Sequence, residues 1–141
     1  MNVWEQETGK WWNDGGVLLG VGYSGGDCGS APENVNSPLA QSFACSGPIP
    51  QGLYTIGAPQ DTIVHGPYVL PLTPDPANQM YGRSGFLVHG DSVLYPGQKA
   101  ASEGCIVLPK TVRQQIWESG DRDLKVVSGL PYPDVDGEIA T

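Results

Sequence analysis

The chain has 141 residues, a length that a single domain with one hydrophobic core accommodates. It contains 20 Gly and 13 Pro but only 16% charged residues, which favours a turn-rich domain over a coiled coil or helical bundle. The net charge of −8 and the lack of adjacent basic residues exclude nucleic-acid binding and disfavour anionic membrane surfaces. The apolar runs are too short to span a bilayer, so we expect no membrane insertion.

The first part of the chain predicts a small antiparallel meander. Residues 3–6 are expected to pair with residues 10–12 across a Thr-Gly turn, and residues 17–21 to add a third strand after an Asn-Asp-Gly-Gly turn. Residues 24–48 are dominated by Gly, Ser, Pro and Asn. They predict one long loop, and loops of this length usually carry a function or are held in place by other parts of the fold.

The rest of the chain predicts short strands and one helix. The expected strands are 53–56, 68–72, 86–88, 105–108 and 124–127. Pro71 indicates an edge strand or a bulge, because proline has no N–H to donate to a ladder. The helix is expected over residues 110–119, with Pro109 in its first turn and Gly120 as its stop.

These elements predict a mostly β fold with one helix after the Cys105 segment. Residues 1–128 are expected to form a single domain. Residues 129–141, which are acidic and contain proline, are expected to form an extended tail.

Two residues at strand ends carry candidate chemistry. His89 follows the strand 86–88 and Cys105 begins the strand 105–108, and each lies beside a glycine. A cysteine nucleophile reacts as its thiolate, a nearby imidazole can take its proton, and backbone N–H groups around Gly104 can form an oxyanion hole. On composition and spacing alone, the plainer interpretation is favoured: a buried small hydrophobe and a structural histidine.

The residues around this pair resemble a known family. Ser102-Glu103-Gly104-Cys105-Ile106 resembles the Ser/Thr-His-Gly-Cys signature of L,D-transpeptidase (YkuD-like) catalytic domains. Residues 86–90 resemble the strand that carries their histidine, and residues 47–56 resemble another strand of that family. Glu103 replaces the second histidine of the signature, and Val107 stands where many members have Asn or Arg.

Further motifs make the chain most similar to one branch of this family. Residues 23–25, 72–76 and 82–92 resemble short L,D-transpeptidase-like effectors that type VI secretion systems deliver. The resemblance implies an L,D-transpeptidase-like β-sandwich or barrel. It also implies secretion without a Sec signal, action in the periplasm of target bacteria, and two kinds of partner: a cognate immunity protein and secretion-system components.

The resemblance also implies a reaction that needs no cofactor and no metal. Cys105 attacks the carbonyl between the third residue and D-Ala of a peptidoglycan tetrapeptide stem, with His89 as the base. Water then completes an L,D-carboxypeptidase reaction, or an amine completes an L,D-transpeptidase reaction or D-amino acid exchange. Because Glu103 departs from the signature, the balance between these outcomes stays open.

Other residues are expected to support this chemistry. Gly104 is a candidate for the oxyanion hole, and Ser102 is a candidate for supporting either the thiolate or, as the favoured interpretation, the loop itself. A backbone carbonyl near Gly90 or Asp91 is expected to orient His89. Three residues are candidates for substrate contacts: Arg83, Glu103 and Ser92. Of these, Arg83 suits a bidentate bond to the diamino-acid carboxylate, which we favour over an ion pair with an acidic loop residue. Asp91 and Ser92 equally suit a turn, Glu103 equally suits a solvated loop, and His65 is interpreted as a loop residue outside the chemistry.

The remaining cysteines predict a disulfide. Cys28 and Cys45 both lie in the loop 24–48, and an oxidising periplasm permits a bond between them that leaves Cys105 as the free thiol. Two alternatives stay open. Both cysteines can remain reduced, or one can pair with Cys105 and silence the nucleophile.

Three other functions compete with this interpretation. An NlpC-type cysteine peptidase is disfavoured, because its cysteine normally precedes its histidine, whereas both histidines here precede Cys105. A phage or cell-wall lysis protein would use the same chemistry and differ in its delivery. A non-catalytic wall-binding module would use Trp11 or Trp12 as a platform for sugars.

Overall fold

The computed structural model describes residues 1–26, 32–91 and 104–129. The strands are β1 (Asn2–Glu5), β2 (Lys10–Trp12), β3 (Leu18–Val21), β4 (Tyr23–Ser24), β5 (Gly52–Ile56), β6 (Gln60–Thr62), β7 (Gly66–Pro74), β8 (Leu87–His89), β9 (Ile106–Val107) and β10 (Asp123–Val127). One α-helix, α1 (Lys110–Glu118), and two 3-10 helices, η1 (Pro32–Asn34) and η2 (Pro38–Ala40), complete the elements seen in these ranges.

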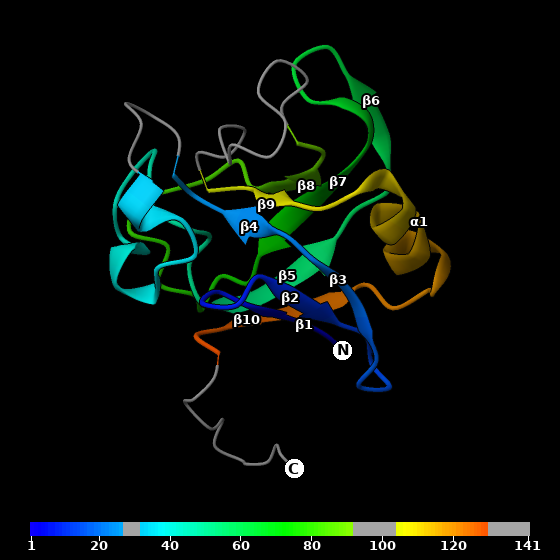
Figure 1. Cartoon of the computed structure of the whole chain (residues 1–141), viewed down its shortest axis with the longest axis horizontal. Coiled ribbons are helices and arrows are strands. Elements are labelled where there is room, and N and C mark those ends of the chain that lie inside the picture. The colour runs from blue at the N-terminus through cyan, green and yellow to red at the C-terminus, as the bar shows by residue number, and fades with distance from the viewer. Residues whose placement is uncertain (27–31, 92–103, 130–141) are drawn as a thin grey trace.

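The strands form one strongly curved sheet in the order β3-β2-β1-β10-β5-β7-β8-β9-β4, with β6 paired to β7 (Figure 1). The two outer strands of this path, β3 and β4, are consecutive in the chain and meet at Gly22. The N–H of Gly22 donates to the carbonyl of Gly9, and a Cβ at Gly22 would lie 1.8 Å from the carbonyl oxygen of Val107. Only glycine allows this close approach, which makes the sheet a nearly closed barrel.

Side chains point alternately to the two faces of each strand, and those on the inner face fill the barrel interior. Trp4 pairs with Val126 across β1 and β10, Leu124 pairs with Tyr54 across β10 and β5, and all four side chains are buried. Helix α1 covers the side between β3 and β7, where Val112 packs directly against Gly20. The core therefore joins both halves of the sheet to the inner face of the helix.

Most of the expected elements are present within one or two residues of their expected ends. The meander β1-β2-β3 is antiparallel as predicted, and α1 begins at Lys110 after Pro109 and stops before Gly120, whose φ is +83°. The long loop 24–48 contains η1 and η2. Its first residue, Ser24, belongs to β4, which was not predicted. Strand β6 was not predicted, and neither was the parallel pairing of β1 with β10.

The expectation that Pro71 marks an edge strand is wrong. Strand β7 is an inner strand, paired with β5 through residues 72–74 and with β8 through Leu70 and Pro71. Pro71 lies where the partner of β7 changes from β5 to β6, and its carbonyl accepts from the N–H of Gly57. The missing N–H is tolerated because it falls at this change of partner.

The predicted tail lies almost wholly outside the described residues, which end at Gly129. Within the described ranges, no helix is long and apolar enough to cross a membrane.

Candidate active site

The two candidate catalytic residues lie on or against strand β8. Val88 pairs with Ile106 in the parallel ladder β8-β9, and both side chains belong to the buried core. Because side chains alternate along a strand, His89 and its partner Val107 project to the opposite, outer face of the sheet. Cys105 immediately precedes β9, and its Sγ accepts from the N–H of Leu87 at 3.3 Å. The thiol therefore lies against β8 two residues before His89.

The thiol of Cys105 is held at the surface of the barrel. The residue is half-buried, whereas Gly104 and Ile106 on either side of it are buried. In addition to the contact with Leu87, Sγ lies 3.8 Å from the carbonyl oxygen of Gly85. Cys105 carries a reduced thiol, so its sulfur can act as a nucleophile.

The imidazole of His89 is oriented by the backbone. Its Nδ1 lies 2.8 Å from the carbonyl oxygen of Gly90, which can accept a hydrogen bond only if Nδ1 carries the proton. Among the described residues, Nε2 is buried and has no hydrogen-bond partner. His89 therefore presents an unprotonated Nε2, the form that a general base requires.

Burial keeps this imidazole uncharged. His89 is only 2% exposed, and desolvation, the largest cause, lowers its pKa to about 4. The charges of His65 and Arg113 also lower the pKa, while the bond to Gly90 and the charge of Asp91 act in the opposite direction. At neutral pH the imidazole of His89 is therefore uncharged, the state in which it can accept a proton.

A buried serine orients the peptide that precedes the thiol. Ser24 on β4 is fully buried; its Oγ donates to the carbonyl of Gly104 at 2.8 Å and accepts from the N–H of Ile49 at 2.8 Å. Because a trans peptide points its C=O and N–H in opposite directions, the N–H of Cys105 points away from Ser24. The peptide that joins Gly104 to Cys105 is thus fixed by Ser24 of β4, which is itself bonded to Ile49.

Arg83 binds the loop 24–48 next to Gly104. Its Nη1 donates to the carbonyls of Gln41 at 2.6 Å and Pro48 at 2.7 Å, and its Nη2 donates to that of Gly47 at 2.8 Å. A Cβ at Gly104 would lie 2.4 Å from Nη2, so the guanidinium packs directly against this residue. The bidentate contact of Arg83 with a substrate carboxylate stays a prediction, but these bonds also give Arg83 a positioning role.

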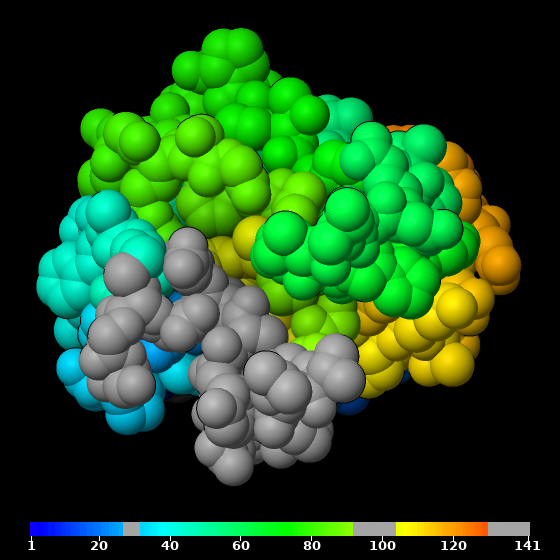
Figure 2. Space-filling view, turned by 90° about the horizontal axis from the view of Figure 1, so that it is seen from above, coloured from blue at the N-terminus to red at the C-terminus, as the bar shows by residue number. Residues whose placement is uncertain are grey.

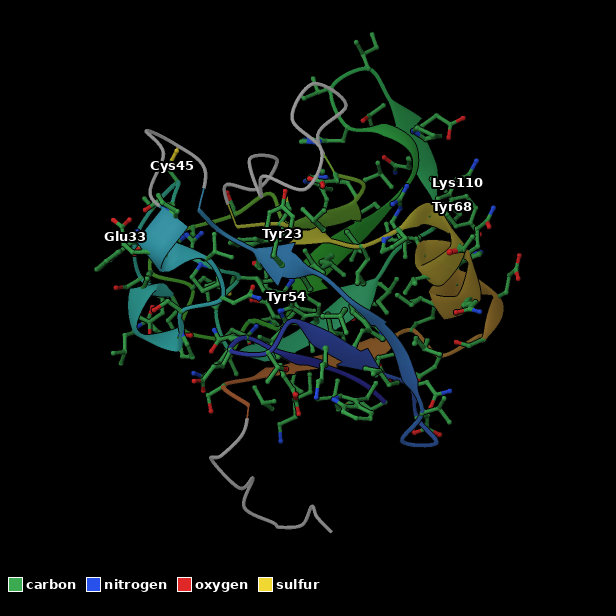
Figure 3. All side chains as sticks on the ribbon, viewed as in Figure 1. Tyr23, Glu33, Cys45, Tyr54, Tyr68 and Lys110 are labelled. Atoms are coloured by element: carbon green, nitrogen blue, oxygen red, sulfur yellow. The ribbon has the colours of Figure 1, made fainter. Side chains whose placement is uncertain are left out.

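Tyr23 links Asp91 to the barrel. The hydroxyl of Tyr23, on β4, donates to Oδ1 of Asp91 at 2.7 Å, and Figure 3 shows the ring of Tyr23 on the outer side of the sheet. The ring of His89 is bonded to the carbonyl of Gly90, whereas Asp91 acts on it through its charge.

The four remaining predicted site residues, Cys28, Ser92, Ser102 and Glu103, lie outside the described residues. Their expected roles stay predictions. Cys45, which is labelled in Figure 3, is disulfide-bonded. Its predicted partner, Cys28, lies outside the described residues, so the pairing of these two cysteines stays a prediction.

Three residues of the site were not found from the sequence. His65 lies in the turn between β6 and β7, and its ring stacks on that of His89, with centroids 4.4 Å apart and planes 24° apart. Ser24 and Arg113 both bind backbone groups around the site. The only sequence signal was the Tyr-Ser-Gly motif at residues 23–25; nothing in the spacing connects His65 to His89.

The described residues contain no group of three His, Cys, Asp or Glu placed to bind a metal ion. The reactive groups that the geometry offers are the thiol and the imidazole.

The fold and the site define a mostly β, barrel-like protein with a cysteine–histidine pair on the outer face of its sheet. Residues 21–128 match the family model of the Tlde1 domain, and the chain therefore belongs to the Tlde1 domain family. This is a family of type VI secretion effectors that resemble L,D-transpeptidases. No curated protein and no solved structure matches the chain.

Proposed function

We propose that the protein is an antibacterial effector that removes D-Ala from tetrapeptide stems of peptidoglycan by covalent catalysis at Cys105. Membership of the Tlde1 domain family supports the effector role, a secretion-system context and a cognate immunity protein. The observation that supports the reaction is a reduced Cys105 thiol bonded to Leu87, two residues before His89 on the same strand, together with a His89 imidazole whose Nδ1 is bonded to Gly90 and whose Nε2 has no hydrogen-bond partner among the described residues.

The first half of the proposed reaction forms a thioester. Nε2 of His89 accepts the thiol proton while Sγ of Cys105 bonds to the carbonyl carbon that joins the diamino acid to D-Ala. The C–N bond then breaks, and the proton on Nε2 passes to the amino group of the departing D-Ala. Burial lowers the pKa of His89 to about 4, so the imidazole starts neutral and readily gives its proton to the departing amine, whereas accepting the thiol proton is the more demanding of the two steps.

The second half releases the stem from the enzyme. Water attacks the thioester to give a tripeptide stem, or an amine attacks it to give a cross-link or an exchanged terminal D-amino acid; His89 takes the proton of the attacking group. The negative oxygen formed in each half requires hydrogen-bond donors that are already in place. The bond from Ser24 to the carbonyl of Gly104 supports such a role for the N–H of Cys105, since it fixes the orientation of that peptide.

Because peptidoglycan lies in the periplasm, we expect the protein to act in the periplasm of the target cell. A direct test incubates the purified chain with the disaccharide tetrapeptide and follows tripeptide and D-Ala by mass spectrometry. We expect D-Ala release by the wild type, and none by Cys105→Ala, by His89→Ala or by wild type treated with iodoacetamide. The disaccharide tripeptide serves as the control, because it has no D-Ala to lose. Release of D-Ala by Cys105→Ala at the wild-type rate would contradict the mechanism.

Toxicity tests the proposed compartment independently. The chain should be harmless in the cytoplasm of a test bacterium and toxic when a signal peptide directs it to the periplasm. Equal toxicity in both compartments would contradict periplasmic action. Binding to sacculi without D-Ala release would favour the wall-binding alternative.

A further inference from the structure

The turn between β6 and β7 holds a second imidazole against the first. Thr62 and Gly66 pair across this hairpin, and the residues between them, Ile63, Val64 and His65, form its turn. Ile63 and Val64 are exposed, whereas His65 is half-buried because its ring covers one face of His89. Figure 2 shows the hairpin (bright green) standing beside the yellow-green and yellow residues of β8 and β9.

The root of the hairpin is fixed to the rest of the fold. Arg113 of α1 is buried; its Nε donates to the carbonyl of Tyr68 at 2.8 Å, its Nη2 to that of Pro67 at 3.0 Å, and its Nη1 to that of Leu108. Figure 3 shows Tyr68 beside the first turn of α1. The N–H of Leu108 in turn donates to the carbonyl of His89 at 3.0 Å. Arg113 therefore fixes the position of the root of the hairpin and, through Leu108, the position of the end of β8.

The turn itself is also held in shape. The N–H of His65 donates to Oγ1 of Thr62 at 2.8 Å, and the N–H of Tyr68 donates to Oδ1 of Asp61 at 3.1 Å. These bonds fix the backbone on both sides of the turn. The contact between the two rings thus joins two rigidly held segments.

We propose that His65 is a positioning residue for His89. The ring of His65 holds the imidazole of His89 flat between the β6–β7 hairpin and the barrel, so that Nε2 stays directed toward the reaction. The bond from Nδ1 to Gly90 fixes one point of the His89 ring, and rotation about that bond is limited by the stacked ring of His65. This inference rests on the proposed function for the role of His89 as the base, and it goes further by naming the residue that orients it.

The stack has a second consequence, for the protonation of His89. The charged groups that act on His89 are His65 from the hairpin, Arg113 from α1 and Asp91 after β8. A proton on His65 opposes a proton on His89, because the centroids of the two rings are only 4.4 Å apart. Removing the charge of His65 while keeping a flat ring should therefore raise the pKa of His89.

The test compares three variants. His65→Phe keeps a flat ring, His65→Ala removes it, and Val64→Ala is the matched control, an exposed neighbour in the same turn. Because the chain has only two histidines, its imidazole NMR spectrum contains only two spin systems, and that of His65→Phe contains only His89.

The wild type should show ring-to-ring nuclear Overhauser effects and an Nδ1-protonated His89. His65→Phe should raise the titration midpoint of His89 by about half a pH unit or more.

Activity provides the second readout. We expect His65→Ala to lower kcat for D-Ala release by on the order of tenfold to a hundredfold, with His65→Phe restoring most of that loss and Val64→Ala leaving kcat unchanged. Absent ring contacts in the wild type, an unchanged His89 midpoint in His65→Phe, or equal kcat values for His65→Ala and wild type would each overturn the proposal. The NMR results need no substrate, so they still decide the inference if the wild type releases no D-Ala.

Discussion

The buried imidazole of His89 should make the protein sensitive to acid. Its pKa is lowered from 6.5 to about 4 in the folded state, chiefly by burial. Between these two values the unfolded chain binds more protons than the folded chain, so stability is retained at neutral pH and falls as the pH drops from about 6.5 to about 4. In this range the free energy of unfolding falls by about 1.4 kcal/mol for each unit of pH, so His89 alone should remove about 2 kcal/mol between pH 7 and pH 5.

Urea unfolding at pH 7, 6 and 5 measures this effect when wild type is compared with His89→Gln. Carboxylates titrate in both proteins and cancel in the difference, so the fall in free energy of unfolding should be about 2 kcal/mol smaller in the variant. If both proteins lose the same stability between pH 7 and pH 5, His89 is not buried as a neutral base, and the assignment of its protonation state is wrong.

Other predictions concern the parts that surround the site. Ser24→Ala leaves the carbonyl of Gly104 and the N–H of Ile49 without their partner, and thermal unfolding should show a loss of about 1–3 kcal/mol together with slower alkylation of Cys105. Cys45→Ser should lower the free energy of unfolding by about 3 kcal/mol, because it removes the disulfide. Dithiothreitol should destabilise the wild type but not this variant, and an equal response of both proteins would argue against the disulfide. Gly22→Ala should lower the free energy of unfolding by about 3 kcal/mol, because the new Cβ would collide with the backbone of Val107. Gly15→Ala is the control and should melt like the wild type, because its Cβ would meet only Asn13 at an ordinary contact distance.

Much of the fold could be predicted from local signals. Turns rich in glycine separate short apolar runs, and the helix is marked by Pro109 and Gly120 at its two ends. The pairing of β1 with β10 could not be found in this way, because it joins residues more than a hundred positions apart and depends on the closure of the barrel. The apolar run around Pro71 identified β7 but not its inner position, which depends on where its partners change.

The site shows the same division between local and distant signals. His89 and Cys105 stand beside glycines at strand ends, and that arrangement is visible in the sequence. The contact of His65 with His89 arises only when the β6–β7 hairpin folds over β8, and no periodicity records it. Arg83 illustrates a third case: its residue type indicated anion binding, which stays a prediction, but nothing in the sequence indicated that its buried guanidinium also binds three backbone carbonyls.

Acylation of Cys105 by a peptidoglycan stem is the central step of the proposed reaction. Intact-protein mass spectrometry of the chain, quenched in acid shortly after mixing with the disaccharide tetrapeptide, tests it most directly. We expect an added mass equal to the substrate minus D-Ala, located by peptide mapping at Cys105 and removed by hydroxylamine, as expected of a thioester. Turnover of the tetrapeptide with no adduct at Cys105, or with an adduct at another residue, would contradict it.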